Sequence, residues 1–296
     1  MKDKLLISFS GGETSGYMLY WCLLHWSDKF EIKVVFANTG EENEETLIFV
    51  KKCAEHFKCD VVWVEAVFHK EYRKGTTHKI VNFETATRSK NLFEEMIKVY
   101  GIPNQAYPHC NRELKLAPIK SYMRFIGWKS YYTAIGIRND EVDRVNSRHN
   151  ELKLLYPFVT EKPITKPHIN FWWSNQPFRL ELKGYEGNCK TCWKKSDLKL
   201  WTIAQETPEK FENFKNLEVK YMRHIPPNRN DEGKKISFFR NNRTAAQILK
   251  EAGSKLKKAV DDSKNINFQS SLLDDDESCD IYAMCGESSL IQELKK

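Results

Sequence analysis

The feature that most constrains the chain is a short segment rich in glycine and hydroxyl side chains, at residues 8–16. It follows the apolar run at residues 5–7 and precedes a helix-like run at residues 17–24, so the pattern predicts a strand, a turn and a helix in succession. Adjacent glycines let the main chain approach an anion closely, and the first-turn amides of the helix point toward that anion. The segment therefore predicts a cradle for nucleotide phosphates. Its candidate binding residues are Ser8, Ser10, Gly11, Gly12, Glu13, Thr14 and Ser15.

The segment at residues 8–16 matches neither of two better-known phosphate-binding motifs. The loop lacks the lysine that follows glycine in a Walker A sequence, and it lacks the three-glycine spacing of a dinucleotide fingerprint. The alternative that remains is a serine-rich strand-to-helix turn, in which Thr14 or Ser15 caps the helix.

Apolar runs and helical periods alternate through the first half of the chain. The runs predict strands at residues 5–7, 33–37, 61–64 and 131–135, and helices are expected at residues 42–57, 89–100 and 112–126. This alternation predicts an α/β fold, in which a mainly parallel sheet is covered by helices on both faces. We expect a nucleotide-binding domain at residues 1–160 and a mostly helical elaboration at residues 161–296. In the elaboration, Thr165 is expected to cap a helix through Trp172 and Trp173, two residues expected to serve packing.

The composition limits the partners and the compartment. The chain has 296 residues and a net charge of +7, a bias that suits anionic nucleotides and permits a nucleic-acid partner. No apolar stretch of about 18 residues and no cleavable leader is present, so we expect a cytoplasmic protein without a membrane partner. In that compartment the eight cysteines are expected to be thiols, metal ligands or redox groups rather than disulfides. Cys22, Cys53 and Cys59 are expected to be small buried residues.

Polar residues also follow two other predicted strands. Asn38, Thr39 and Gly40 come directly after the second strand, and Gly136 follows the fourth. Ligands of an open α/β sheet bind outside the carboxyl ends of its strands, so these residues are predicted to face the same nucleotide.

The segment from Gly136 to Arg144 combines arginines with carboxylates. Arg138 and Arg144 are candidate catalytic residues that would neutralise charge on a leaving pyrophosphate. Asp140 and Glu141 are candidate Mg²⁺ ligands. The alternative is a surface cluster of salt bridges.

Cys110 lies at or just before a predicted helix start, with Arg112 and Lys115 in the first turns. Cations and a helix amino terminus favour the thiolate form, which ligates metals or attacks electrophiles. Cys110 and Lys115 are therefore candidate catalytic residues, and the two cations alternatively grip phosphate.

Cys189 and Cys192 form a Cys-x-x-Cys pair. The pair is half of a metal site, because a closed tetrahedral site needs about four ligands. Cys110 is the best candidate for a third ligand, and Cys285, Cys279 or His109 for the fourth. Thiolate-rich sites suit an iron-sulfur cluster or zinc, and the spacing does not separate the two.

Taken together, these segments resemble the phosphoadenosine phosphosulfate reductase family, in particular its reductase-like branch common in bacteriophage genomes. The loop at residues 10–15 resembles the pyrophosphate loop (PP-loop) of the adenine-nucleotide alpha-hydrolase superfamily. The other matching segments are residues 37–40, 110–118, 136–141 and 187–192. The resemblance implies a Rossmann-like fold of the HUP type, an adenine nucleotide such as ATP as ligand, and chemistry at the phosphate nearest the adenosine.

The same resemblance bears on the cysteines. Adenylyl-sulfate reductases that carry a 4Fe-4S cluster have a cysteine pair, a gap of about eighty residues and then Cys-x-x-Cys. Here Cys110 and Cys189 fit the gap, but His109 stands where the first cysteine of the pair would be. The segment Met284-Cys285-Gly286-Glu287 only partly matches the mobile nucleophilic cysteine at the end of the reductases.

The full phosphate loop favours an enzyme of the ATP pyrophosphatase type. It would adenylate a substrate oxygen, which a sulfur or amine nucleophile then displaces, as in a sulfurtransferase. A sulfur-donor protein and a nucleic-acid acceptor such as tRNA are candidate partners. A reductase of adenylyl or phosphoadenylyl sulfate, with Cys285 or Cys110 as nucleophile, is the first alternative, and a non-catalytic nucleotide-binding protein is the second.

Overall fold

The computed structural model describes residues 2–69, 74–226 and 233–267. In this part of the chain, a sheet of six strands has the order β4-β3-β2-β1-β5-β6. Its strands are β1 (Asp3–Ser8), β2 (Phe30–Ala37), β3 (Val61–Val67), β4 (Thr77–Val81), β5 (Tyr132–Ala134) and β6 (Leu154–Leu155). All neighbouring pairs are parallel except β3 and β4, which are antiparallel. The expectation of a mainly parallel, Rossmann-like sheet is confirmed.

The helices lie where the periodicity predicts them in the first half of the chain. They are α1 (Glu13–Trp26), α2 (Glu44–Phe57), α3 (Asn91–Tyr100), α4 (His109–Asn111) and α5 (Ala117–Phe125), with a π-helical turn η1 (Arg112–Leu116) between the last two. In the second half they are η2 (Asn139–Arg144), α6 (Pro157–Thr160), α7 (Lys166–Ser174), α8 (Asp197–Glu206), α9 (Glu209–Tyr221), η3 (Arg240–Asn242) and α10 (Ala245–Ala252).

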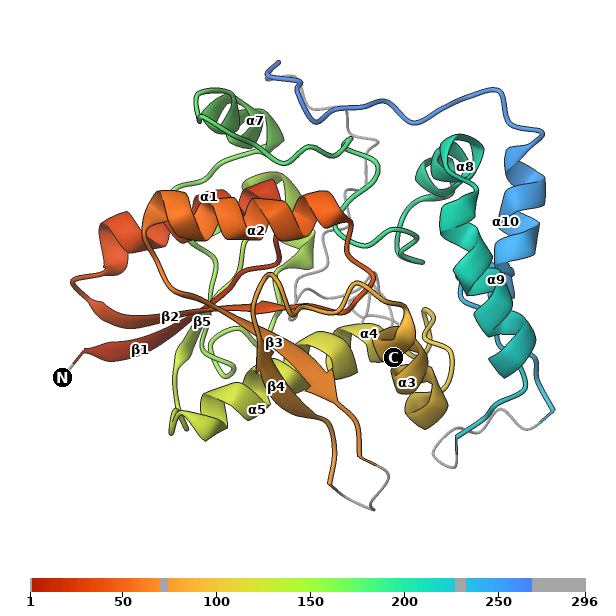
Figure 1. Ribbon diagram of the computed structural model, residues 1–296. Helices are drawn as coiled ribbons and strands as arrows, with labels where there is room; N and C mark the ends of the chain where they lie inside the picture. Colours follow the sequence, from red (N-terminus) through yellow and green to blue (C-terminus); the bar gives the residue numbers. More distant parts are fainter. Residues whose placement is uncertain (1, 70–73, 227–232, 268–296) are drawn as a thin grey trace, which may run out of the picture.

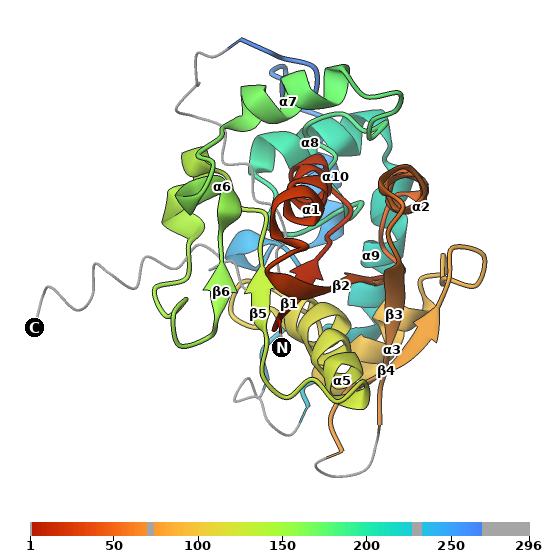
Figure 2. The same ribbon diagram turned by 90° about the vertical axis from the view of Figure 1, so that its left-hand side faces the viewer.

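Alternating side chains of the central strands build two separate core layers. Leu5 and Ile7 of β1 pack with α1, α2 and α7, whereas Leu6 between them packs with α5. This follows from the two-residue period of a strand, which sends successive side chains to opposite faces. Figure 2 shows α1 and α2 on one side of the sheet and α5 on the other.

The helices α8, α9 and α10 form a further layer beside the carboxyl edge of the sheet, toward which the arrows of β1 and β2 point (Figure 1). They share a core with α3, in which the rings of Phe93 and Phe214 lie 5.6 Å apart between centroids. The second half of the chain therefore packs directly on the first half. The boundary between two domains near residue 160 stays a prediction.

Helix α7 packs on α1 through Trp173. This confirms the prediction that the two tryptophans serve packing. Trp173 is buried, and a Cβ added at Gly16 of α1 would lie 2.8 Å from its ring. Trp172 stacks on Tyr17 with 4.4 Å between centroids. Thr165 caps α7 as expected, with its hydroxyl 2.8 Å from His168 Nδ1.

Candidate functional site

The segment after β1 forms a tight loop that ends at the amino terminus of α1. Gly11 has a φ of +81°, and a Cβ added there would lie 2.7 Å from the Thr46 side chain, so glycine is required on both counts. Gly12 is the N-cap of α1, and no side chain of the described residues caps the helix there. The alternative in which Thr14 or Ser15 caps α1 is therefore wrong. The first-turn amides are left for another acceptor.

Hydroxyl groups cluster inside this loop. Ser10 Oγ lies 2.9 Å from Ser15 Oγ, and the Ser15 hydroxyl donates a hydrogen bond to the Gly12 carbonyl at 2.9 Å. The loop after β5 touches the same place, because a Cβ added at Gly136 would lie 3.2 Å from Ser15 Cα. The polar groups after β1 and β5 thus meet at one point on the carboxyl edge of the sheet.

Arg138 joins the two loops. It is 5% exposed, and its guanidinium donates to the Thr14 hydroxyl at 3.4 Å. Its Nε donates to Asp140 Oδ1 at 3.0 Å, and its backbone N–H donates to Glu141 Oε2 at 3.2 Å. The arginine is therefore held rigidly at the phosphate loop by its own carboxylate neighbours.

The same contacts bear on the Mg²⁺ site expected at Asp140 and Glu141. Asp140 Oδ2 accepts the backbone N–H of Lys166 at 3.3 Å, and Glu141 Oε1 pairs with Arg144. All four carboxylate oxygens thus face donors or cations, and the two residues orient Arg138 and Arg144 rather than present oxygens to a metal. As they lie, they do not fit a Mg²⁺ ion.

A cavity of about 140 Å³ lies over the phosphate loop. It is lined by Ser10, Gly12, Glu13, Thr14, Ser15, Gly136 and Arg138, and also by several residues between positions 180 and 199, among them Cys189 and Cys192. Four lysines also line it: Lys166, Lys183, Lys195 and Lys199. The cavity is thus rich in cations, as an anion site requires.

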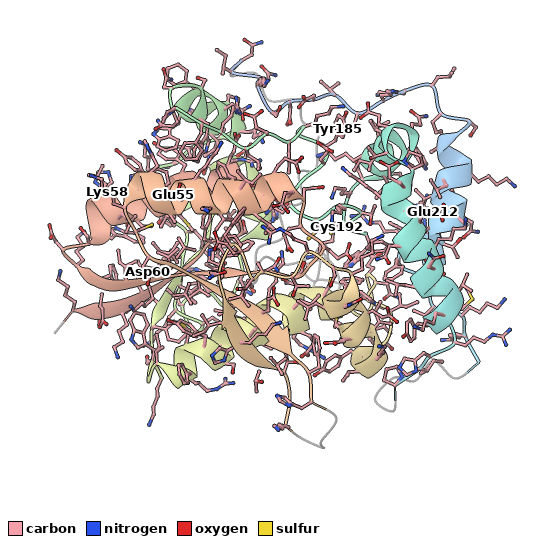
Figure 3. The ribbon with its side chains drawn as sticks, viewed as in Figure 1. Glu55, Lys58, Asp60, Tyr185, Cys192 and Glu212 are labelled. Carbon is pink, nitrogen blue, oxygen red and sulfur yellow. The ribbon has the colours of Figure 1, made fainter. Side chains whose placement is uncertain are left out.

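Backbone and side-chain contacts fix the Cys-x-x-Cys segment beside the loop. The Asn188 amide donates to the Ser10 carbonyl at 2.8 Å, and the Asn188 carbonyl accepts the backbone N–H of Asn43 at 3.1 Å. Glu42 and Cys189 form an antiparallel bridge. A segment distant in sequence therefore forms part of the wall of the phosphate cavity, and Figure 3 labels Cys192 between the sheet and helices α8 and α9.

A second cavity, of about 30 Å³, is lined by three of the four predicted metal ligands, Cys110, Cys189 and Cys192. Lys115 also lines it and is 6% exposed. The π-helical turn between α4 and α5 contains Lys115, and such turns occur frequently at functional sites.

These thiols are chemically suitable metal ligands, but they do not lie close enough together to hold a metal ion. Thiolates are the ligands that zinc and iron-sulfur clusters prefer. Within residues 2–69, 74–226 and 233–267, however, no three histidine, cysteine or carboxylate side chains are close enough to hold a metal ion. The fourth candidate, Cys285, and Cys279 lie outside the described residues.

Some predicted binding residues face away from the phosphate cavity. The Asn38 amide is buried and donates to Glu65 at 2.6 Å and to the Thr87 carbonyl at 2.8 Å. The Thr39 hydroxyl donates to Glu42 at 2.8 Å, and a Cβ added at Gly40 would lie 2.8 Å from the Ser89 carbonyl. These three residues shape the loop after β2, and of them only Thr39 lines a cavity, the smaller one.

Ser8, Gly11 and Arg144 are also absent from the linings of the two cavities in the described part of the chain. Ser8 ends β1, Gly11 packs on α2, and Arg144 pairs with Glu141.

Sequence reasoning missed the lysines after the Cys-x-x-Cys pair. Lys195 is 9% exposed, its ammonium donates to the Cys189 carbonyl, and it lines the larger cavity. Burial lowers its pKa, while the nearby thiols of Cys192 and Cys189 act in the opposite direction. The only signal in the sequence is the basic run at residues 190–199, which does not distinguish a buried lysine from a solvated one.

The fold and this cavity define a Rossmann-like α/β protein with a glycine-serine loop and a thiol pair at the carboxyl edge of its sheet. A model of the phosphoadenosine phosphosulfate reductase domain matches residues 4–153, and the chain belongs to that family.

Among curated relatives, a phage protein is consistent with the phage branch of the family. An uncharacterized nin region protein of Escherichia phage lambda is 28% identical over 206 residues, which cover 68% of this chain and 69% of the relative. Two uncharacterized proteins of Methanocaldococcus jannaschii are 31% and 28% identical, over 45% and 75% of this chain. The matched segments are 26% and 42% of those two proteins.

In the described part of the chain, no helix has the length and apolar character needed to cross a bilayer.

Proposed function

We propose that the protein binds an adenine nucleotide with its triphosphate over the loop after β1 and acts at the phosphate nearest the adenosine. The observation that carries this proposal is the single cavity shared by the uncapped amino terminus of α1, Arg138 and four lysines. Backbone amides at a helix amino terminus and fixed cations are the groups that hold phosphates in proteins.

The reaction we favour is adenylation followed by sulfur transfer. An oxygen of the acceptor attacks the α-phosphorus of ATP, the bond from that phosphorus to the β-phosphate oxygen breaks, and pyrophosphate leaves. Sulfide, delivered by a donor protein, then attacks the activated carbon: the carbon–sulfur bond forms, the carbon–oxygen bond to the adenylate breaks, and AMP departs. Arg138, fixed between Thr14 and Asp140, is placed to stabilise the charge that develops on the phosphates.

The thiols support the sulfur half of this proposal. Cys189 and Cys192 line both the phosphate cavity and the small cavity that holds Cys110. These three thiols are the candidate ligands of a cluster or zinc; as they lie they are not close enough together to hold a metal ion by themselves.

The test measures ATP cleavage in the presence of a candidate acceptor. The full-length protein is mixed with Mg-ATP and bulk tRNA, and pyrophosphate and AMP are measured. We expect release that depends on the acceptor and falls at least a hundredfold in Arg138→Ala, the order of the loss when a charge-stabilising donor is removed. Arg124→Ala, an exposed arginine of α5, is the control and should match the wild type.

The second candidate function is reduction of a sulfonucleotide. The observation that favours it is the placement of two thiols in the wall of the phosphate cavity itself. Sulfite release from adenylyl sulfate under reducing conditions, together with no pyrophosphate from ATP, would select this function over the first.

A further inference from the structure

Glu13 is an unexpected residue in an anion cradle. It is the first residue of α1, it lines the phosphate cavity, and it is 8% exposed. Burial is the largest influence on its carboxyl group and raises the pKa, with Arg179 acting against it. A carboxylate at this point would repel a bound phosphate unless another group cancels its charge.

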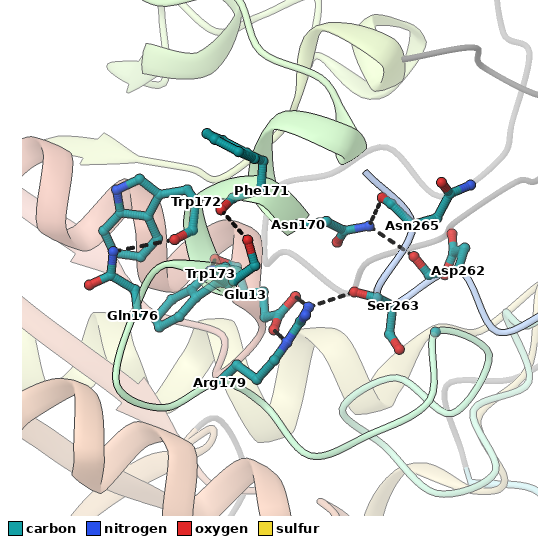
Figure 4. A network of polar contacts seen from close by, with 12 residues as sticks. Glu13, Asn170, Phe171, Trp172, Trp173, Gln176, Arg179, Asp262, Ser263 and Asn265 are labelled. Atoms are coloured by element: carbon teal, nitrogen blue, oxygen red, sulfur yellow. Dashed lines mark hydrogen bonds and ion pairs between the residues drawn. The ribbon is translucent and has the colours of Figure 1, made fainter. Parts of the chain in front are cut away.

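Arg179 supplies that charge. Its Nε donates to Glu13 Oε1 and its terminal nitrogen to Glu13 Oε2, both at 3.0 Å, so the pair is bidentate. Both side chains are largely buried, with 15% of the arginine and 8% of the glutamate exposed. Arg179 comes from the segment that follows α7, far from Glu13 in the sequence, and Figure 4 shows the two side chains facing one another. Sequence reasoning placed Glu13 among the nucleotide ligands, whereas its carboxylate faces this arginine.

The same guanidinium holds a third segment. Its terminal nitrogen donates to the Ser263 carbonyl at 2.5 Å, and Ser263 lines the phosphate cavity (Figure 4). We call residues 259–267 the strap. The Asn170 amide also holds the strap, by donating to the carbonyls of Asp262 at 2.8 Å and Asn265 at 2.6 Å.

We infer that Arg179 is a positioning residue for phosphate binding: it cancels the charge of Glu13 at the start of α1 and ties the strap into the wall of the cavity. The inference rests on the proposed function in so far as the anion is a nucleotide phosphate. Arg179 acts on that anion through Glu13 and the strap.

The electrostatic half is tested by a charge-rescue experiment. Binding of inorganic pyrophosphate and of ATP is measured by calorimetry on the full chain, for the wild type, Arg179→Ala, Arg179→Lys, Glu13→Gln and the double variant Arg179→Ala/Glu13→Gln. We expect Arg179→Ala to weaken pyrophosphate binding at least tenfold, Arg179→Lys to weaken it less, and the double variant to recover most of the loss. A role limited to packing would leave the double variant as weak as Arg179→Ala, and that result would overturn the inference.

One control variant, and one of the variants above taken alone, keep the test decisive. Arg148→Ala, which breaks an exposed ion pair with Glu151, should bind like the wild type. If Arg179→Ala does not fold, Glu13→Gln alone decides, because the inference predicts that it binds pyrophosphate at least as tightly as the wild type. Weaker binding by folded Glu13→Gln contradicts the inference.

The strap is tested without any ligand. Trypsin cleavage after Lys258 and Lys264 should be several-fold faster in Arg179→Ala and in the double variant than in the wild type or Arg148→Ala. Equal rates would refute the tie to the strap. A wild-type protein that binds neither pyrophosphate nor ATP would refute the proposed function and the electrostatic half, while the cleavage rates would still decide the strap.

Discussion

Asn188 and Ser10 lie 178 positions apart in the sequence, and the side-chain amide of the first donates to the carbonyl of the second at 2.8 Å. This bond joins the Cys-x-x-Cys segment to the phosphate loop. It places the thiols of the second half of the chain beside the loop after β1.

The first prediction concerns this bond. Asn188→Ala should weaken ATP binding about tenfold, equivalent to about 1.4 kcal/mol, because the loop loses the contact that holds it against the opposite wall. Calorimetric titration with ATP measures the change. Asn175→Ala removes a similar amide-to-carbonyl bond, 2.7 Å long, at the exposed end of α7, and should leave ATP binding unchanged. Equal losses in both variants would show that Asn188 has no special role.

A second prediction separates crowding from backbone strain. Gly11→Ala and Gly75→Ala both place alanine at positive φ, +81° and +65°, but among the described residues only the first meets a neighbour, at 2.7 Å. We expect Gly75→Ala to lower the free energy of unfolding by about 1 kcal/mol and Gly11→Ala by about 3 kcal/mol or more. Urea titration of the two variants and the wild type provides the measurement. Similar losses would mean that the contact with Thr46 relaxes freely.

The third prediction concerns the thiols. Protein purified without oxygen should contain iron and sulfide, or zinc, and the metal should be lost in Cys189→Ser and Cys192→Ser. Metal analysis and the absorbance spectrum distinguish a cluster from zinc. Cys59→Ser, at a half-buried cysteine that lines neither of the two cavities, is the matched control and should keep the metal. A wild-type protein without bound metal would contradict the metal half of the proposal.

The fourth prediction concerns stability against pH. Glu218 is buried and accepts the backbone N–H groups of Phe238 and Ala245, at 3.1 and 2.7 Å. Burial raises its pKa from 4.5 to about 7, against the opposing effect of those two bonds. The folded state therefore keeps the proton to a higher pH than the unfolded state, so the contribution to stability is full below pH 4.5 and is lost as the pH rises to about 7.

Glu218→Gln should flatten this dependence. The expected change in slope is at most about 1.4 kcal/mol per pH unit between pH 5 and about pH 7. Urea unfolding across that range provides the measurement. Glu212→Gln, at an exposed position of the same helix, should leave the slope as it is in the wild type. A slope that Glu218→Gln does not change would contradict the raised pKa.

The sequence predicts the sheet well, because its strands are buried apolar runs separated by helices with a clear period. It does not predict β4 or β6. Strand β4 lies at the edge of the sheet and its residues are mixed in character, and β6 has two residues, too few for a pattern. The tight turn between β1 and α1 is predicted because adjacent glycines after an apolar run are a local signal; that it binds phosphate stays a prediction.

The long-range partners of the loop could not be predicted from the sequence. The pairing of Glu13 with Arg179 and of Ser10 with Asn188 arises only when the elaboration packs on the sheet, and no local pattern marks it. For the same reason, Asn38 carries the polar character of a ligand residue but binds the buried carboxylate of Glu65. Burial alone would raise the pKa of Glu65, yet hydrogen bonds from Lys79, Thr87 and Asn38 outweigh it and lower that pKa.

The most direct test of the account is a crystal structure of the protein with a non-hydrolysable ATP analogue. We predict that the phosphates accept hydrogen bonds from the backbone amides at residues 12–15 and that the α-phosphate faces Arg138, across the cavity from Cys189. An analogue bound at another place, or a loop that stays empty at saturating analogue, would contradict the account.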